Sequence, residues 1–259
     1  MSETIQEQLG KYQLVTQLPE EQVQVPTFLK GGFGRLVYTL YDEQRRTTFE
    51  GNSALKLQWD EANQVVTGSS FFDPFLVNQI VGGILGGKTP QPQDITPEIL
   101  QMIEGAHYVD LKAGALRSTK DSWNSRNNGL AQRLSEHVDL ARLEREPALI
   151  TGLQLQPFPE DTGGYGLDLM PKEGEFNVHY DDRLLEKWNQ YKFTQTDEFG
   201  LPSDLDKTKG TRTWYTRKDG FSRLGLDGGL DLDSDRDNLG SSDSDGRVVI
   251  CAEGANAKK

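Results

Sequence analysis

Three histidines, His107, His137 and His179, are the side chains best suited to proton transfer or metal binding near neutral pH. They are far apart in the sequence, fall in different predicted elements and lack the short spacing of a metal site. The chain also contains neither a Gly-x-Ser-x-Gly nucleophile motif nor a glycine-rich phosphate loop ending in Lys-Ser or Lys-Thr. We therefore interpret the histidines as structural, and we expect no metal ion and no cofactor.

Other reactive side chains also fit structural roles. Cys251 follows the apolar run Val248-Val249-Ile250, which is typical of a buried, inert thiol. Asp182 and its neighbour Asp181 could form a carboxylate pair, but adjacent side chains on a strand point in opposite directions, so we expect a solvated loop. The run Gly31-Gly32-Phe33-Gly34 precedes a predicted strand, whereas a dinucleotide-binding loop follows one, so it indicates a turn. We therefore predict a protein that is not an enzyme.

The stretch from Arg223 to Arg247, called here the Asp/Gly segment, mixes two kinds of position. Leucines recur as a framework, and the positions between them are almost wholly Asp, Gly, Ser and Asn. Because side chains alternate along a strand, the leucine pairs should face a core while Gly225 and Asp231 face away. The framework comprises Leu224, Leu226, Leu230, Leu232, Leu239, Ser234, Ser242, Gly246 and Arg247.

Two interpretations of this segment need no family resemblance. A low-complexity loop is one, but the regular leucines and the Val-rich strand that follows disfavour it. Calcium binding is the other, because Asp231-x-Asp233-x-Asp235 resembles the start of a loop of oxygen ligands. That register places Arg236 where the turn needs glycine and Ser242 where a bidentate glutamate belongs. A register that starts at Asp233 places Asn238 at the glycine position and Ser244 at the glutamate position. A calcium-dependent structural or adhesion domain remains the alternative function.

A third interpretation comes from a family. The Asp/Gly segment resembles the variable region of proteins diversified by a diversity-generating retroelement, in which a reverse transcriptase copies a template with errors at adenines. Asparagine codons then give a restricted set that includes Asp, Gly, Ser, Arg and Asn and excludes Lys, Glu, Gln, Met and Trp. The resemblance implies a non-catalytic binding protein with a hypervariable recognition surface. Its variable, ligand-binding positions would be Gly225, Asp227, Gly228, Gly229, Asp231, Asp233, Asp235, Arg236, Asn238, Gly240, Ser241, Asp243, Ser244 and Asp245.

The resemblance also implies a fold and a kind of partner. Most proteins of that family carry the variable residues on a C-type-lectin-like fold, in which Trp214 and Gly246-Arg247 could occupy positions on the late strands. We expect the variable positions to be mostly exposed, and Leu226, Leu230, Leu232 and Leu239 to be buried. The ligand would be a protein or a glycan. Because the variable set here contains no Tyr or Trp, a basic partner held by charge is expected.

Charge and composition limit the other partners. The 259-residue chain has a net charge of −12, and half of that excess lies between Gly225 and Gly246, where seven Asp and one Arg give −6. We expect neither nucleic acid nor an anionic membrane as partner, because both require clustered Lys and Arg. Phe71–Gly87 is interrupted by Asp73 and is too short to span a bilayer, so it predicts a core helix. With one cysteine and no leader pattern, we predict a cytoplasmic protein.

Helices followed by many short strands predict an α+β fold with a mostly antiparallel sheet. We divide it into a loose arm (1–28), an N-terminal α/β portion (29–93) and a C-terminal α+β binding domain (94–259) whose variable region is about 223–247. Helices are expected from Thr96, with Pro97 first, and over 130–145, with a helical turn near 182–190. Strands are expected at 34–41, 53–59, 148–156, 165–170, 176–180, 211–216, 221–226 and 248–250, with a hairpin turn at 218–220.

Overall fold

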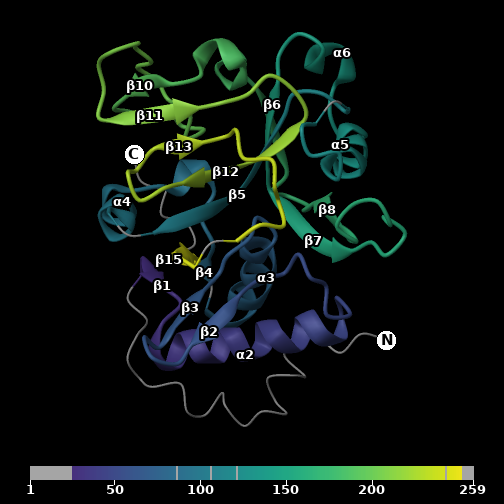
Figure 1. Ribbon diagram of the computed structural model, residues 1–259, viewed down its shortest axis with the longest axis vertical. Coiled ribbons are helices and arrows are strands. Elements are labelled where there is room, and N and C mark those ends of the chain that lie inside the picture. The colour runs from purple at the N-terminus through teal and green to yellow at the C-terminus, as the bar shows by residue number, and fades with distance from the viewer. Residues whose placement is uncertain (1–24, 86, 106, 121, 243, 253–259) are drawn as a thin grey trace.

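The large sheet of the computed structural model is built from strands between residues 108 and 247. The structure describes residues 25–252 apart from 86, 106, 121 and 243. The large sheet has eight strands, and helices lie against it and below it (Figure 1). The α+β class is therefore confirmed. The helices are α2 (Gly31–Thr47), α3 (Asp73–Leu85), α4 (Pro97–Ile103), α5 (Asn127–Ser135) and α6 (Leu140–Leu143), with 3-10 turns at Pro92–Asp94, Asp182–Leu184 and Glu186–Trp188.

Strand β5 (Tyr108–Leu116) lies inside the large sheet, and all nine of its residues are buried. It pairs antiparallel with β12 on one side and with β6 on the other. The short strand β14 also pairs with β5, in parallel. The remaining strands continue the order β10-β11-β13-β12-β5-β6-β9. Their bounds are β6 (Ala148–Thr151), β9 (Asn177–Tyr180), β10 (Tyr191–Phe193), β11 (Arg212–Tyr215), β12 (Phe221–Leu226), β13 (Leu232–Asp233) and β14 (Gly246–Arg247).

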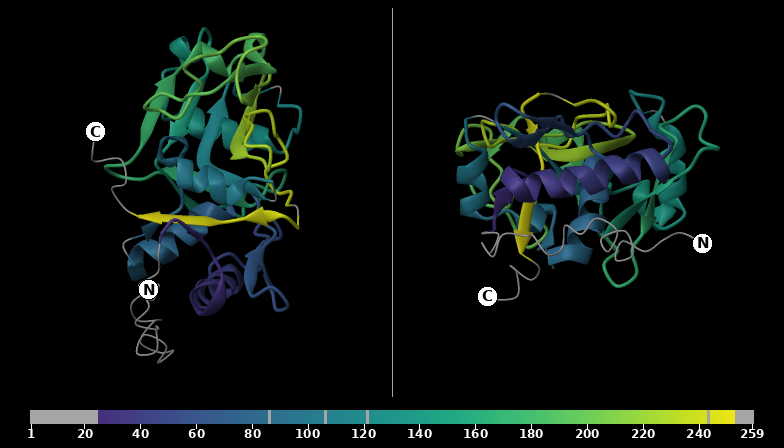
Figure 2. Two further views of the ribbon diagram at one scale, coloured as in Figure 1. Left: turned by 90° about the vertical axis from the view of Figure 1, so that its left-hand side faces the viewer. Right: turned by 90° about the horizontal axis from the view of Figure 1, so that it is seen from below.

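Three small sheets complete the molecule. In one, β15 (Val249–Ala252) lies between β1 (Thr27–Phe28) and β4 (Gly87–Lys88) and crosses the middle of the molecule (Figure 2). The others pair β2 (Gln58–Asp60) with β3 (Val65–Thr67), and β7 (Leu153–Pro157) with β8 (Leu167–Pro171). Residues 27–28 of the predicted loose arm are thus part of a sheet, whereas residues 1–24 lie outside the described residues.

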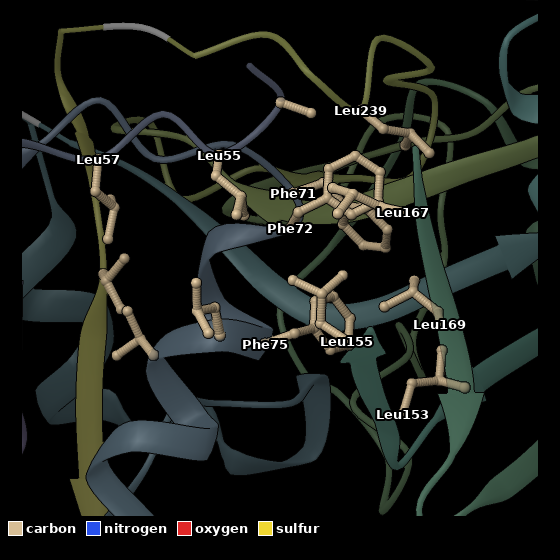
Figure 3. Packing of buried hydrophobic residues seen from close by; sticks show 14 of the residues in the cluster. Leu55, Leu57, Phe71, Phe72, Phe75, Leu153, Leu155, Leu167, Leu169 and Leu239 are labelled. Atoms are coloured by element: carbon tan, nitrogen blue, oxygen red, sulfur yellow. The ribbon is translucent and has the colours of Figure 1, made fainter. Parts of the chain in front are cut away.

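Two hydrophobic clusters lie on opposite sides of β5. The first packs α2 and α3 against the β7–β8 pair, and Figure 3 shows Phe71 and Phe72 beside Leu167, and Phe75 beside Leu155. This cluster draws on residues from both sides of the predicted boundary at residue 93. The second cluster lies between the large sheet and α4 and contains the fully buried Trp214. Within β5, Leu116 belongs to the first cluster, while Val109, Leu111, Ala113 and Ala115 belong to the second.

The predicted strand at 34–41 is wrong, because these residues lie in α2. Phe33, Leu36, Val37, Leu40 and Tyr41 are buried at helical spacing, and this period prevails over the local β-propensity of the apolar residues. The glycine run therefore opens a helix and is not a turn before a strand. In the predicted strand 53–59, only Gln58 and Trp59 are in a strand, β2.

The predicted hairpin at 218–220 is also wrong. β11 and β12 are not hydrogen-bonded to each other, because β13 lies between them, parallel to β11 and antiparallel to β12. The inserted strand brings Leu232 opposite both Trp214 and Leu226, which buries three large apolar side chains together. A turn signal reports only that the chain reverses, and it leaves open whether a third strand enters the gap.

Several other predictions are confirmed. α3 occupies the predicted core helix, and α4 begins at Pro97, with the Thr96 hydroxyl accepting a hydrogen bond from the Ile99 amide. The predicted helix 130–145 is divided into α5 and α6, because Asp139 caps a new helix by accepting from the Arg142 amide. Across the described residues, no helix combines the length and the apolar character needed to cross a membrane.

Candidate functional site

The Asp/Gly segment forms a long excursion between two strands of the large sheet. It leaves β12, reverses, returns as β13, and then runs down one flank of the molecule to β14 (yellow in Figures 1 and 2). Its last strand pairs with β5, with Gly246 opposite Tyr108 and Arg247 opposite Val109. Both ends of the segment are thus fixed to β5 or its neighbour.

The first reversal is a turn closed by Asp227. Its carboxylate accepts hydrogen bonds from the Gly229 amide at 2.9 Å and the Asp231 amide at 3.0 Å, and its carbonyl accepts from the Leu230 amide at 2.9 Å. Leu230 adopts a left-handed conformation with φ of 65° and is half-buried. The prediction that Leu230 is buried is therefore wrong, because the turn directs its side chain to the edge of the second cluster.

Beyond the turn, the segment is inserted into the sheet by β13. Asp231 accepts a hydrogen bond from the Thr213 amide at the start of this insertion. Leu232 and Leu226 are buried in the second cluster, as predicted. Leu239 is buried in the first cluster, beside Phe71 and Leu167 (Figure 3), and its carbonyl accepts from the Phe71 amide at 3.2 Å. Leucines of one segment thus enter both cores.

The side chain of Arg117, which directly follows β5, forms hydrogen bonds with the middle of the Asp/Gly segment. Its buried guanidinium donates to the carbonyl and hydroxyl of Ser234, at 3.0 and 2.8 Å. It also donates to the hydroxyls of Ser222 and Thr216, at 2.8 and 2.9 Å, and to the Leu184 carbonyl at 2.7 Å. Burial lowers the pKa of Arg117 to about 9. This side chain joins β5, β11, β12 and the Asp/Gly segment through neutral acceptors alone.

Arginines offset much of the segment's acidity. Arg236 pairs with Asp233 at 2.8 Å, and Arg217 pairs with Asp237 at 3.2 Å. Arg212, beneath the first turn, donates to the Leu230 carbonyl. Because two of these three arginines come from outside the Asp/Gly segment, the surface is less negative than the −6 counted from the sequence.

A second charged cluster lies beneath the segment around Tyr108. The guanidinium of Arg223 forms an ion pair with Asp110 at 3.0 Å, and both side chains are almost fully buried. The Tyr108 hydroxyl donates to Asp110 at 3.2 Å, and the Arg236 guanidinium lies 4.2 Å from the centre of the Tyr108 ring. Burial holds the pKa of Tyr108 well above its usual value. The cluster is closed from outside by Arg236, which the resemblance counts as variable.

Gly225 has no room for a side chain over Tyr108. A Cβ at Gly225 would lie 2.1 Å from the Tyr108 hydroxyl oxygen, and every residue of β12 is buried. Asp233, opposite Gly225 on β13, is also buried, and burial raises its pKa to about 6 despite the Arg236 ion pair. The expectation that Gly225 faces away from the core into solvent is therefore wrong.

The remaining variable positions lie at the surface to different degrees. Gly229, Asn238, Ser244 and Asp245 are exposed, while Asp243 lies outside the described residues. Burial raises the pKa of the half-buried Asp235. The half-buried set is Asp227, Gly228, Asp231, Asp235, Arg236, Gly240 and Ser241. Most of the described positions therefore reach solvent, but the expectation that they are mostly exposed is wrong, because the larger group is only half-buried and two positions are buried.

The three histidines lie apart and make separate contacts. His107 packs edge-on to Phe28, His137 is exposed near Phe176, and His179 stacks on Phe199 with its ring nitrogen 3.2 Å from Asp181. Within the described residues, no three His, Cys, Asp or Glu side chains are grouped so as to hold a metal ion.

Cys251 and the Asp181–Asp182 pair are also engaged elsewhere. Cys251 is buried, and burial raises its pKa to about 11, so its thiol is protonated at neutral pH. Asp181 pairs with Arg183, whereas Asp182 pairs with Lys187 at 2.6 Å, so the two carboxylates face different partners.

Several residues that support this surface were missed in the sequence. Tyr108 and Asp110 belong to β5 and Arg117 directly follows it; the Asp, Lys and Gly of β5 interrupt the apolar run that normally reveals a buried strand. Arg212 lies within the predicted strand 211–216, and Arg217 directly follows it. An excess of arginines beside an acidic segment was the available signal.

No protein-family model, no curated protein and no solved structure matches this chain.

Proposed function

We propose that this protein is a non-catalytic binding protein, and that its Asp/Gly segment is a hypervariable recognition surface diversified by a retroelement. The observation that carries the proposal is that most leucines of the segment are buried whereas most residues between them are not. Leu226, Leu232 and Leu239 are buried in two cores, while most of the small polar residues between them reach solvent. Exchanging exposed side chains on a fixed backbone alters a surface without disturbing the packing that folds it.

The geometry narrows the proposed variable set. Gly225 and Asp233 lie against Tyr108 and Arg236, so we propose that they shape the scaffold and contact no ligand. The surface available to a ligand comprises Asp227, Gly228, Gly229, Asp231, Asp235, Arg236, Asn238, Gly240, Ser241, Ser244 and Asp245.

The ligand proposed is a protein or a glycan, and a protein with a basic patch suits the remaining acidity. The exposed Asp245 and the half-buried Asp227 and Asp235 supply that acidity. A C-type-lectin-like fold for residues 94–259 and a cytoplasmic location remain parts of the proposal.

A calcium-dependent domain has no specific support in this geometry. Asp231 accepts from the Thr213 amide and Asp233 is paired with Arg236, so two of the three candidate ligands already have protein partners. A calorimetric titration with calcium tests this alternative, because micromolar binding that raises the melting temperature would favour it over the proposal.

Two display libraries test the proposed function. In the first, the accessible positions of the Asp/Gly segment are diversified with codons derived from AAC and AAT. In the second, the same number of positions is diversified in exposed loops elsewhere, including residues 203–209. Both libraries are selected on immobilised lysozyme, a basic protein. The proposal predicts folded binders from the first library at a much higher frequency. Equal frequencies, or loss of folding throughout the first library, would contradict it.

A further inference from the structure

The loop between β5 and α5 carries a tryptophan that packing does not explain. Trp123 is 87% exposed, and the other large apolar residues exposed in the described part of the chain are Val25 and Leu140. Isolated apolar residues are common on surfaces, but tryptophan offers the largest apolar area and usually buries most of it. An almost fully exposed indole therefore suggests a partner.

The backbone on both sides of Trp123 is fixed. The Ser122 hydroxyl accepts from the Phe221 amide at 3.2 Å, and the Ser122 amide donates to Asn128 at 3.2 Å. Gly220 permits this contact, since a Cβ there would lie 2.4 Å from the Ser122 hydroxyl oxygen. On the other side, the Asn124 side chain donates to the Tyr165 hydroxyl at 3.2 Å. The loop thus presents the indole from an ordered base, which lowers the entropy lost on binding.

The same loop adjoins the Asp/Gly segment. The Asn124 amide nitrogen lies 3.5 Å from the Asp237 carbonyl, and the Asn127 side chain donates to that carbonyl at 2.7 Å. Asn238, an exposed variable position, is the next residue along the chain. Trp123 therefore lies at the border of the proposed recognition surface, but outside the segment that would be diversified.

We infer that Trp123 is an invariant aromatic anchor of the recognition surface, and that it inserts into an apolar pocket of a protein ligand bordered by Lys or Arg. This inference rests on the proposed function. Binding surfaces that tolerate diversity combine rigid aromatic anchors with adaptable Ser, Gly and Asn, and the variable positions here contain small and charged residues but no aromatic one. Trp123 supplies the aromatic anchor, and the acidic residues of the segment select the basic border of the pocket.

Peptides selected against the full-length wild-type protein from a phage-displayed random dodecapeptide library are the probe. We expect enriched peptides to combine an apolar residue with Lys or Arg. Their binding should shift Trp emission to shorter wavelength, because Trp214 is already fully buried and Trp123 is the most exposed indole among the described residues. Trp123→Phe should remove that shift.

Four variants, two tests and two controls, separate the contribution of Trp123 from that of the Asp/Gly segment. Trp123→Ala should weaken peptide binding by about 30-fold or more, as expected for a hot-spot residue. Leu140→Ala, at a second exposed apolar side chain, should leave binding unchanged. Asn238→Arg should weaken binding of basic peptides, whereas Ser203→Arg, in an exposed loop, should not.

Each outcome decides the matter. Loss of binding with both Trp123→Ala and Asn238→Arg supports the anchor. Loss with Asn238→Arg alone overturns the anchor but leaves the proposed function intact. Loss with Trp123→Ala alone overturns the claim that the two belong to one surface. The inference is overturned if neither Trp123→Ala nor Asn238→Arg changes binding, or if no peptide is enriched. It is also overturned if the protein binds neutral oligosaccharides in place of peptides.

Discussion

Replacing Arg117 with alanine tests how the Asp/Gly segment is held. The wild-type guanidinium makes five hydrogen bonds to neutral acceptors, worth roughly 2 kcal/mol each because the donor is charged. Burial of the guanidinium, which lowers its pKa to about 9, opposes part of that gain. With some relaxation around the vacated site, we expect Arg117→Ala to lower the free energy of unfolding by about 3–5 kcal/mol.

Urea denaturation and hydrogen exchange measure this effect. The Ser234 amide donates to the Tyr215 carbonyl at 2.8 Å, so peptides covering residues 231–236 should lose protection in the variant. Arg46→Ala is the matched control, because Arg46 is 64% exposed, and its ion pair with Asp42 should contribute less than about 1 kcal/mol. A loss below 1 kcal/mol for Arg117→Ala, or unchanged protection of 231–236, would refute the role assigned to Arg117.

Three further predictions follow from the same geometry. Leu232→Ala should lower the free energy of unfolding by about 2–5 kcal/mol, because Leu232 is buried. Leu230→Gly should change it by less than about 1 kcal/mol, because Leu230 is half-buried and has a left-handed conformation. Equal losses for the two variants in urea denaturation would contradict this difference. Gly225→Ser should lower the free energy of unfolding by about 1–3 kcal/mol in the same assay, because its Cβ would contact the Tyr108 hydroxyl. An unchanged free energy of unfolding would mean that Gly225 can vary like the accessible positions. Burial raises the pKa of Asp73 from 3.8 to about 6, so the folded state binds this proton more tightly than the unfolded state does. The resulting contribution to the free energy of unfolding is on the order of 3 kcal/mol, and it is lost as the pH rises from about 4 to about 6. The free energy of unfolding of the wild type should fall by that amount relative to Asp73→Asn across this pH range, as measured by melting curves, and an unchanged difference between the two proteins would contradict the shift.

The sequence predicted the parts of this fold that carry a strong local pattern. α4 has a Thr cap, a proline at its first position and inward-facing isoleucines, and α3 is mostly apolar, so both helices could be assigned from their own residues. α2 could have been assigned too, because its buried residues keep helical spacing, but the glycines at its start were interpreted as a turn.

Pairing between strands that are distant in the sequence could not be predicted from local patterns. The insertion of β13 between β11 and β12 depends on Leu232 meeting Trp214 and Leu226, and no local signal in a two-residue strand announces that contact. The burial of Gly225 likewise depends on Tyr108, which comes from a strand distant in the sequence, and Asp233 is paired with Arg236, which packs on the same ring. The pattern of the Asp/Gly segment therefore located the candidate surface, while tertiary contacts determined which of its residues face solvent.

Deep sequencing of this gene in the source population tests the central claim most directly. The account predicts substitutions concentrated in codons 223–247, at the accessible positions and at sites that are adenines in a nearby template copy beside a reverse-transcriptase gene. Codons for Leu226, Leu232, Leu239 and Trp123 should stay constant. If codons 223–247 vary no more than codons 29–93, or if no template copy accompanies the gene, the segment is not a diversified recognition surface.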